Sequence, residues 1–316
     1  RFLNAAGSVL YATPAAAAEP AVIFDLGGKF DKYFNESAYN GAQRWAEETG
    51  QEYAEFELTS EAQREQAIRR LAEQGYSPII MVGFMSATPL SQIAPEYPDT
   101  KFVIVDAVVE APNVRSVVFN EHEGSYLVGM LAAMASETGT VGFIGGMDIP
   151  LIRKFACGYA QGVLATNPDA TVIANFTGTT PAAWNDPARG SELTLAQIGQ
   201  GADVVYAAAG GTGVGVLQTA ADNDILSIGV DSNQNYLHPG EVLTSMIKRV
   251  DNAVYEAMLA GAEVETGVQV MGVANEGVGY ALDENNAALI TDEMRAAVDA
   301  AAAQIADGSL VVHDYM

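Results

Sequence analysis

The stretch AVIFDLGGKFDKYFNESAYNGAQRWAEETG, residues 21–50, contains the unit that the rest of the chain repeats. Its first part, from Ala21 to Asp25, is an apolar run of strand length that ends in a carboxylate. The part from Glu36 to Thr49 places apolar residues three and four positions apart, which is typical of an amphipathic helix, and Gly50 is a stop signal. A strand followed by a helix is half of a βαβ unit, so this stretch predicts a parallel sheet covered by helices.

The same alternation runs through the chain in two series. In the first series we expect further strands at 52–58, 78–83, 101–106 and 114–119, and helices at 60–74 and 85–96. In the second series we expect strands at 140–145, 170–176, 204–207 and 225–231, and helices at 124–136, 152–165, 187–199 and 215–222. Strands that alternate with helices form parallel sheets with right-handed crossovers. Two series in a chain of 316 residues therefore predict an α/β protein of two doubly wound lobes.

The charge balance excludes one large class of function. The chain carries 40 acidic and 15 basic residues, a net charge of −25. A nucleic-acid-binding protein needs basic patches that neutralise phosphates, so no nucleic-acid partner is expected. Cys157 is the only cysteine, which excludes an intrachain disulfide and a zinc site built from several cysteines.

The first residues predict export. An apolar run follows Arg1, and Ala16-Ala17-Ala18 before Glu19 has the small-residue pattern of a signal-peptidase site. We therefore expect residues 1–18 to be a cleaved signal peptide. No cysteine lies near this site, so the expected product is a free periplasmic protein without a lipid anchor.

The carboxyl ends of the predicted strands indicate a binding site. Asp25, Asp106 and Asp231 each end an apolar strand, and glycines such as Gly83 and Gly145 end others. Ligands of open parallel sheets bind beyond the carboxyl ends of the strands, where glycine also lets the backbone approach a ligand. Each aspartate taken alone is equally a helix cap or a turn residue. Three of them in one chain favour a ligand site between the lobes.

Signatures of enzymes are absent from the sequence. The run GGTGVG at 210–215 does not fit the dinucleotide-binding pattern, and no G-K-[ST] of a phosphate-binding loop occurs. The three histidines have no metal-ligand spacing, and no nucleophile elbow is present. We expect a protein without catalytic activity, metal or cofactor.

The segment DKYFNESAYNG at 31–41, together with Asp25, resembles the basic membrane protein family of ABC-transporter solute-binding proteins, whose best-understood branch is the purine nucleoside receptors. The resemblance continues, in order, at 102–106, 123–129, 142–146, 185–190, 228–234 and 243–248. It implies a type I periplasmic-binding fold, with 19–119 and 249–273 in the N-terminal lobe, 120–248 and 274–316 in the C-terminal lobe, and crossing strands as the hinge. It also implies a monomer that works with an ABC permease and an ATPase. The family's lipoprotein cysteine has no counterpart in this sequence.

The resemblance also implies a ligand and the residues that hold it. The ligand would be a purine nucleoside such as guanosine, inosine or adenosine, held between the lobes by stacking on its base and hydrogen bonds to its base edge and ribose. The implied residues are Phe34 and Trp184 for stacking, Asp25 and Asn35 for the base edge with Asp106 close by, and Asp231, Lys248 and the Gly211 backbone for the ribose. Two alternatives remain open: the same fold binding a free nucleobase, a sugar or another small solute, and a ligand-sensing module for a membrane partner.

Overall fold

The computed structural model describes residues 18–315, so the predicted signal peptide lies outside the described residues except for Ala18. The described residues form two six-stranded sheets. The strands of the first sheet are β1 (Ala21–Phe24), β2 (Ala54–Glu57), β3 (Ile79–Met81), β4 (Phe102–Val105), β5 (Val114–Phe119) and β11 (Gly267–Met271). The strands of the second sheet are β6 (Thr140–Met147), β7 (Thr171–Gly178), β8 (Val204–Ala208), β9 (Leu226–Asp231), β10 (Val242–Lys248) and β12 (Val278–Tyr280).

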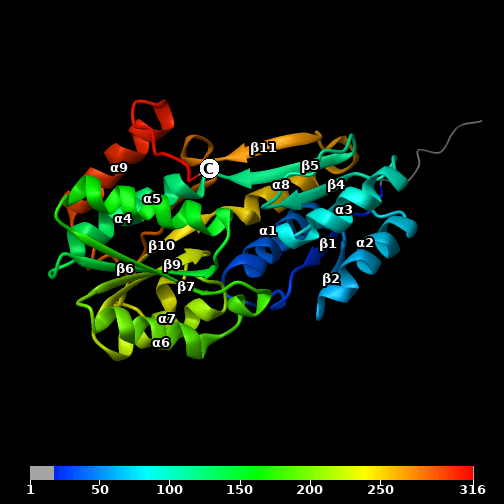
Figure 1. Ribbon diagram of the computed structural model, residues 1–316. Helices are drawn as coiled ribbons and strands as arrows, with labels where there is room; N and C mark the ends of the chain where they lie inside the picture. Colours follow the sequence, from blue (N-terminus) through cyan, green and yellow to red (C-terminus); the bar gives the residue numbers. More distant parts are fainter. Residues whose placement is uncertain (1–17, 316) are drawn as a thin grey trace, which may run out of the picture.

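Each sheet has its own group of helices. Those of the first sheet are α1 (Phe34–Thr49), α2 (Arg64–Glu73), α3 (Ala87–Ile93) and α8 (Val250–Ala260). Those of the second sheet are α4 (Glu121–Ala135), α5 (Pro150–Thr166), α6 (Pro187–Ile198), α7 (Thr212–Asp222) and α9 (Asp292–Asp307). Figure 1 shows the two groups side by side, with the first sheet on the right. We call each sheet with its helices a lobe.

The strand order confirms the predicted fold class. The first sheet runs β11-β5-β4-β3-β1-β2 and the second β12-β10-β9-β8-β6-β7. All the pairings between these strands are parallel except that of β10 with β12. Each strand and helix expected up to residue 231 is present within a few residues. The expected helix at 85–96 is an exception, because 3₁₀ turns at 84–86 and 94–96 flank a short α3, and Pro95 cannot donate the helical hydrogen bond.

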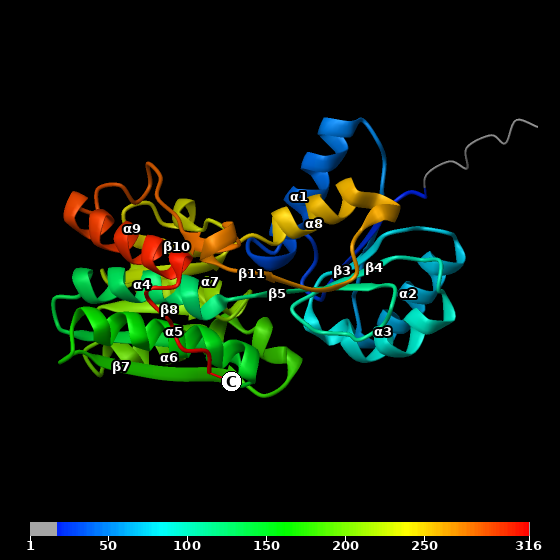
Figure 2. The same ribbon diagram turned by 90° about the horizontal axis from the view of Figure 1, so that it is seen from above.

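The chain crosses between the lobes from β5 to α4, from β10 to α8 and from β11 to β12. These crossings are tied together: the Asn120 N–H donates to the carbonyl of Met271 at 2.8 Å, and the Arg249 N–H to that of Gly277 at 2.9 Å. Helix α8 returns to the first lobe and lies against α1, as both Figure 1 and Figure 2 show. A Cβ at Gly41 would lie 2.1 Å from the carbonyl oxygen of Asp251, so these two helices pack in backbone contact.

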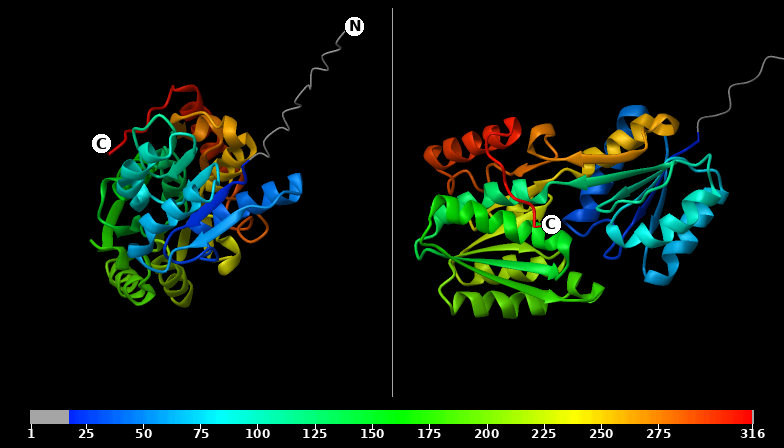
Figure 3. Two further views of the ribbon diagram at one scale, coloured as in Figure 1. Left: turned by 90° about the vertical axis from the view of Figure 1, so that its right-hand side faces the viewer. Right: turned by 45° about the horizontal axis from the view of Figure 1, so that its top comes forward.

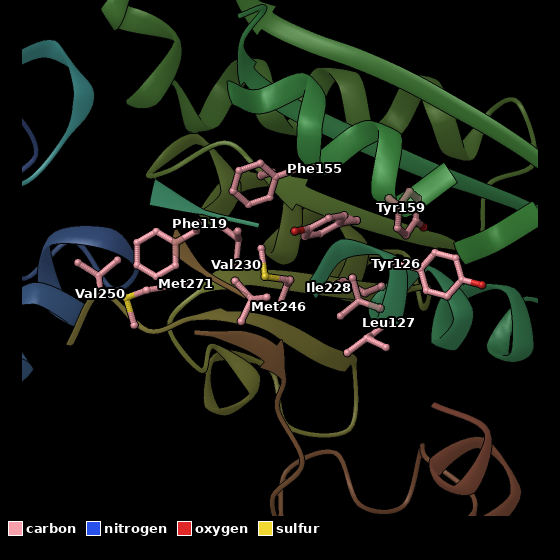
Figure 4. Packing of buried hydrophobic residues seen from close by; sticks show 14 of the residues in the cluster. Phe119, Tyr126, Leu127, Phe155, Tyr159, Ile228, Val230, Met246, Val250 and Met271 are labelled. Carbon is pink, nitrogen blue, oxygen red and sulfur yellow. The ribbon is translucent and has the colours of Figure 1, made fainter. Parts of the chain in front are cut away.

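One large apolar cluster connects the two lobes through the crossings. Figure 4 shows part of this cluster, with Phe119, Val250 and Met271 on one side and Tyr126 and Tyr159 on the other. The crossing strands therefore run through packed side chains next to the ends of the sheets. In the views of Figure 3, α9 lies with the second lobe, beside α4. Within residues 18–315, no helix has the length and apolar character needed to cross a membrane.

Candidate ligand site between the lobes

A cavity of about 730 Å³ lies between the lobes. That volume is within the usual range of small-molecule sites, roughly 300–1,000 Å³. The structure brings together on its wall all the residues that the sequence predicted for the ligand: Asp25, Phe34, Asn35, Asp106, Trp184, Gly211, Asp231 and Lys248. Residues at the ends of β1, β3, β4, β8, β9 and β10 contribute to this wall, as the rule for open parallel sheets predicts.

Two of the predicted aspartates have an unusual backbone. Asp106 follows β4 and Asp231 ends β9, and their φ angles are +70° and +64°. Residues with a side chain rarely adopt this left-handed conformation, which costs on the order of 1–3 kcal/mol and concentrates at functional sites. The backbone thus turns sharply at two strand ends, and both side chains lie on the cavity wall.

Lys248, at the end of β10, is paired with two carboxylates. Its Nζ lies 2.7 Å from Oδ2 of Asp106 and 3.1 Å from Oε1 of Glu121, and the side chain is only 2% exposed. Burial alone would lower the pKa of Lys248, but the negative charges of Asp106 and Glu121 outweigh it and hold the pKa above its ordinary value. The ammonium is therefore charged and fixed in place.

Three aromatic rings surround the same ammonium. Nζ of Lys248 lies 5.0 Å from the ring centre of Phe119, 5.3 Å from that of Phe34 and 5.6 Å from that of Phe155. Such cation–π contacts add to the ion pairs and restrict the lysine to one position.

Asp231 differs from Asp106 because its carboxylate lacks a hydrogen-bond partner. No hydrogen bond or ion pair reaches the Asp231 side chain from the part of the chain that the structure describes. Burial raises the pKa of Asp231 to about 7, although the charge of Lys248 acts in the opposite direction. This side chain therefore has free acceptor atoms on the cavity wall.

The raised pKa of Asp231 predicts a pH-dependent stability in the absence of ligand. The ordinary pKa is 3.8 and the folded value is about 7, so between these pH values the folded chain retains a proton that the unfolded chain releases. The contribution of this group to the free energy of unfolding falls as the pH rises through that window. Asp231→Asn carries no such charge, so its stability relative to wild type is expected to increase from pH 4.5 to pH 8. Denaturant unfolding of both proteins across this range measures the difference, and a constant difference contradicts the assignment.

Asp25 is held by a residue that the sequence reasoning missed. Nη2 of Arg64, on α2, donates to Oδ1 of Asp25 at 2.7 Å. Arg64 is 3% exposed and also contacts Glu61 and Ser86. A role of Arg64 at the site could not be predicted from the sequence, because a single arginine in a charged helix is ordinarily a surface residue.

The side chain of Asn35 forms hydrogen bonds with the backbone of Asp25. Its Oδ1 accepts the N–H of Asp25 at 2.9 Å, and its Nδ2 donates to the carbonyl of Asp25 at 3.3 Å. The amide thus holds the turn that carries the Asp25 carboxylate. One N–H of the amide is left for a ligand.

Phe34 and Trp184 lie on opposite lobes. Phe34 is the first residue of α1 in the first lobe, and Trp184 ends a 3₁₀ turn, Pro181–Trp184, in the second lobe. The indole lies against the backbone of Gly146, since a Cβ there would be 2.2 Å from Cζ3 of Trp184. A glycine at 146 is therefore required for the ring to occupy this position.

The lobes also contact each other beside the cavity, through Tyr33. Its carbonyl accepts a hydrogen bond of 2.5 Å from Oγ of Ser232, and the carbonyl of Lys32 accepts one of 3.3 Å from Nε2 of Gln234. The phenol packs against Gly210, where a Cβ would lie 2.9 Å from its oxygen. The described conformation is thus one in which the lobes have closed on the cavity.

The charges on the cavity wall are mostly negative. Among the described residues, Lys248 is the one lysine or arginine on it, against the carboxylates Asp25, Asp31, Glu57, Asp106 and Asp231. Among residues 18–315, no group of three or more histidine, cysteine, aspartate and glutamate side chains could hold a metal ion. The wall therefore disfavours a negatively charged ligand.

Two α/β lobes joined by crossing strands, with a ligand-sized cavity between them, define a two-lobed solute-binding protein of the periplasmic-binding-protein fold. The chain belongs to the family of PnrA-like ABC transporter substrate-binding proteins, whose family model matches residues 18–311. This match confirms the resemblance that the segment at 31–41 indicated.

Individual relatives agree with this family. An ABC transporter nucleoside-binding protein, BmpA, from Lactococcus lactis is 33% identical, over 92% of this chain and 88% of its own length. An uncharacterized lipoprotein of Pyrococcus furiosus is 35% identical, over 82% of this chain and 69% of its own length. The crystal structure of an ABC transporter solute-binding protein from Aeropyrum pernix has a TM-score of 0.84 and 28% identity, with 94% of each chain covered.

The names of three relatives contradict the expected localisation. The Pyrococcus furiosus relative and two others, from Pyrococcus abyssi and Pyrococcus horikoshii, are 33–35% identical and are named lipoproteins. The prediction of a free periplasmic protein without a lipid anchor is therefore wrong. The small residues before Glu19 suggested a cleavage site, but an alanine-rich stretch is equally compatible with a linker behind a lipid anchor.

Proposed function

We propose that this chain binds one purine nucleoside, such as guanosine, inosine or adenosine, between its lobes and passes it to the permease of an ABC importer. The observation that carries this proposal is the pair of aromatic rings, Phe34 and Trp184, on opposite lobes of a cavity that also contains the free carboxylate of Asp231. The nucleoside-binding relative from Lactococcus lactis supports it.

The base would lie between the two rings. Stacking on aromatic side chains is worth about 1–3 kcal/mol per base and does not depend on which purine is present. Oδ1 of Asp25 is engaged by Arg64, which leaves Oδ2 as an acceptor for a ring N–H or an exocyclic amine. Asn35 would act with it through its remaining N–H, and Asp106 would stay paired with Lys248 close by.

The ribose would lie against Asp231 and Lys248. A carboxylate without partners accepts hydrogen bonds from two neighbouring hydroxyls, and such charge-assisted bonds are stronger than neutral ones. A lysine ammonium has three N–H donors, and Asp106 accepts one of them, so a further donor is available for a ribose oxygen. The backbone at Gly211, which begins α7, would contact the sugar from the second lobe.

Catalysis is not part of this proposal. Within residues 18–315, the cavity wall has no cysteine, histidine or serine that could serve as a nucleophile or base. Bound nucleoside is therefore expected to be recovered unchanged. Because the cavity is completed by residues of one chain, we further propose a monomer in which 19–119 with 249–273 moves against 120–248 with 274–316.

A ligand screen by thermal or chemical denaturation tests the function. At a concentration about 100 times its dissociation constant, a purine nucleoside is expected to raise the free energy of unfolding by about 2.7 kcal/mol. The corresponding free base should stabilise less, because it lacks the ribose. The nucleoside 5′-monophosphate should also stabilise less, because its phosphate would face the acidic wall. Stabilisation by a sugar or an amino acid and by no nucleoside contradicts the proposal.

A further inference from the structure

A row of buried charges lies beneath the cavity at the crossings between the lobes. Asp106 contacts Lys248 at 2.7 Å, and Lys248 contacts Oε1 of Glu121 at 3.1 Å. Oε2 of Glu121 lies 3.0 Å from Nζ of Lys154. The Glu121 side chain is completely buried, and the Lys154 side chain is 10% exposed. Acidic and basic groups therefore alternate along the whole row.

The four residues come from different parts of the fold. Asp106 follows β4 in the first lobe, and Lys154 lies on α5 in the second. Glu121 begins α4, immediately after the crossing from β5, and Lys248 lies at the crossing from β10 to α8. Nζ of Lys154 also donates to the carbonyl of Phe119, the last residue of β5, at 2.8 Å. The row thus joins the ligand cavity to two of the crossings.

Glu121 itself does not line the cavity. Each of its two carboxylate oxygens forms an ion pair with one lysine, and neither oxygen accepts a hydrogen bond from residues 18–315. A buried carboxylate held between two lysines can move little. Its negative charge therefore helps to fix the position of the Lys248 ammonium.

Asp106 accepts one N–H of the Lys248 ammonium at 2.7 Å, and the negative charge of Glu121 attracts the same ammonium at 3.1 Å. The rings around Nζ restrict the space in which the ammonium can move. Without Glu121, the Asp106 hydrogen bond would be the main contact that holds the ammonium, and its distance to the ligand would be less strictly fixed.

We propose that Glu121, held in place by Lys154, is a positioning residue for ligand recognition: its charge holds the Lys248 ammonium where it can donate to the sugar part of the ligand. This role rests on the proposed nucleoside function. It makes a prediction that a purely structural role does not make. Loss of Glu121 should weaken binding of a ligand with a ribose much more than binding of the free base.

The experiment measures the dissociation constants of a purine nucleoside and of its free base by calorimetry, with the whole chain and with Glu121→Gln. We expect the nucleoside to bind at least roughly tenfold more weakly to the variant, because a hydrogen bond from a charged donor is lost. The free base should change by less than about threefold, since stacking and the Asp25 contacts remain.

Glu123→Gln is the matched control. Glu123 lies on the same helix near the same crossings, but its carboxylate contacts Asn120 and the backbone of Val273 and not Lys248. This variant should keep the ratio of nucleoside to base affinity found in wild type. If Glu121→Gln does not fold, the variant Glu121→Gln with Lys154→Met removes one charge of each sign and should show the same selective loss.

The outcomes separate the two proposals. If wild type binds no purine nucleoside, the proposed function is wrong, and the proposed role of Glu121 is then wrong as well. If wild type binds the nucleoside and the Glu121 variants bind it equally well, or lose nucleoside and base affinity in equal proportion, the positioning role alone is refuted.

Discussion

Lys248→Met is expected to lower the free energy of unfolding by about 3–5 kcal/mol, which is the usual cost of removing one partner from a buried ion pair. The methionine would leave the carboxylates of Asp106 and Glu121 buried without the cation that both of them contact. Within residues 18–315, Oδ1 of Asp106 already lacks a hydrogen-bond partner, so the loss of Lys248 would leave both oxygens of this carboxylate without one. Denaturant unfolding without ligand measures this loss.

Arg295→Met provides the control for Lys248→Met. Arg295 pairs with Asp299 on the surface of α9, where the two side chains are 59% and 53% exposed. Water screens such a pair, so its removal should change the stability little. Equal losses in the two variants would mean that the ion pairs of Lys248 contribute no more than a surface pair, and the described arrangement of buried charges would then be wrong.

Trp184→Ala is expected to weaken binding of a purine nucleoside by about 1–3 kcal/mol, or roughly five- to 150-fold, by removing one of the two stacking rings. The free base should lose a similar factor, because it is stacked in the same way. This pattern differs from that expected for Glu121→Gln, in which the loss is confined to the nucleoside. Titration calorimetry with both ligands separates the two patterns.

The control for Trp184→Ala is Tyr236→Ala, which removes an aromatic ring that is 48% exposed and does not line the cavity. Its affinity for the nucleoside should equal that of wild type. A Trp184→Ala protein that binds with unchanged affinity but unfolds much more easily would show that the indole is only a packing residue on Gly146, and the base would then have to be placed elsewhere.

Local pattern alone was enough to predict the two-lobed α/β fold. Apolar runs of strand length and helical spacing between them are properties of neighbouring residues, so they are readable without a structure. The strand-ending Asp25, Asp106 and Asp231 could be grouped into one site for a related reason. All parallel strands of a sheet present their carboxyl ends at the same edge, so residues far apart in sequence meet there. The residues predicted for stacking depended on the family resemblance.

Contacts between residues that are far apart in the sequence could be identified only from the tertiary structure. The sequence reasoning assigned no strand or helix after residue 231, where short strands such as β12 pair with remote partners. Arg64 contacts a carboxylate 39 positions away, and Lys248 contacts one 142 positions away. The pattern of apolar residues around Glu121 and Lys154 does not distinguish them from charged residues on the surface. Their burial follows from the packing of the crossings. A buried ion pair forms only where two distant segments of backbone meet, and the sequence around either residue does not show this.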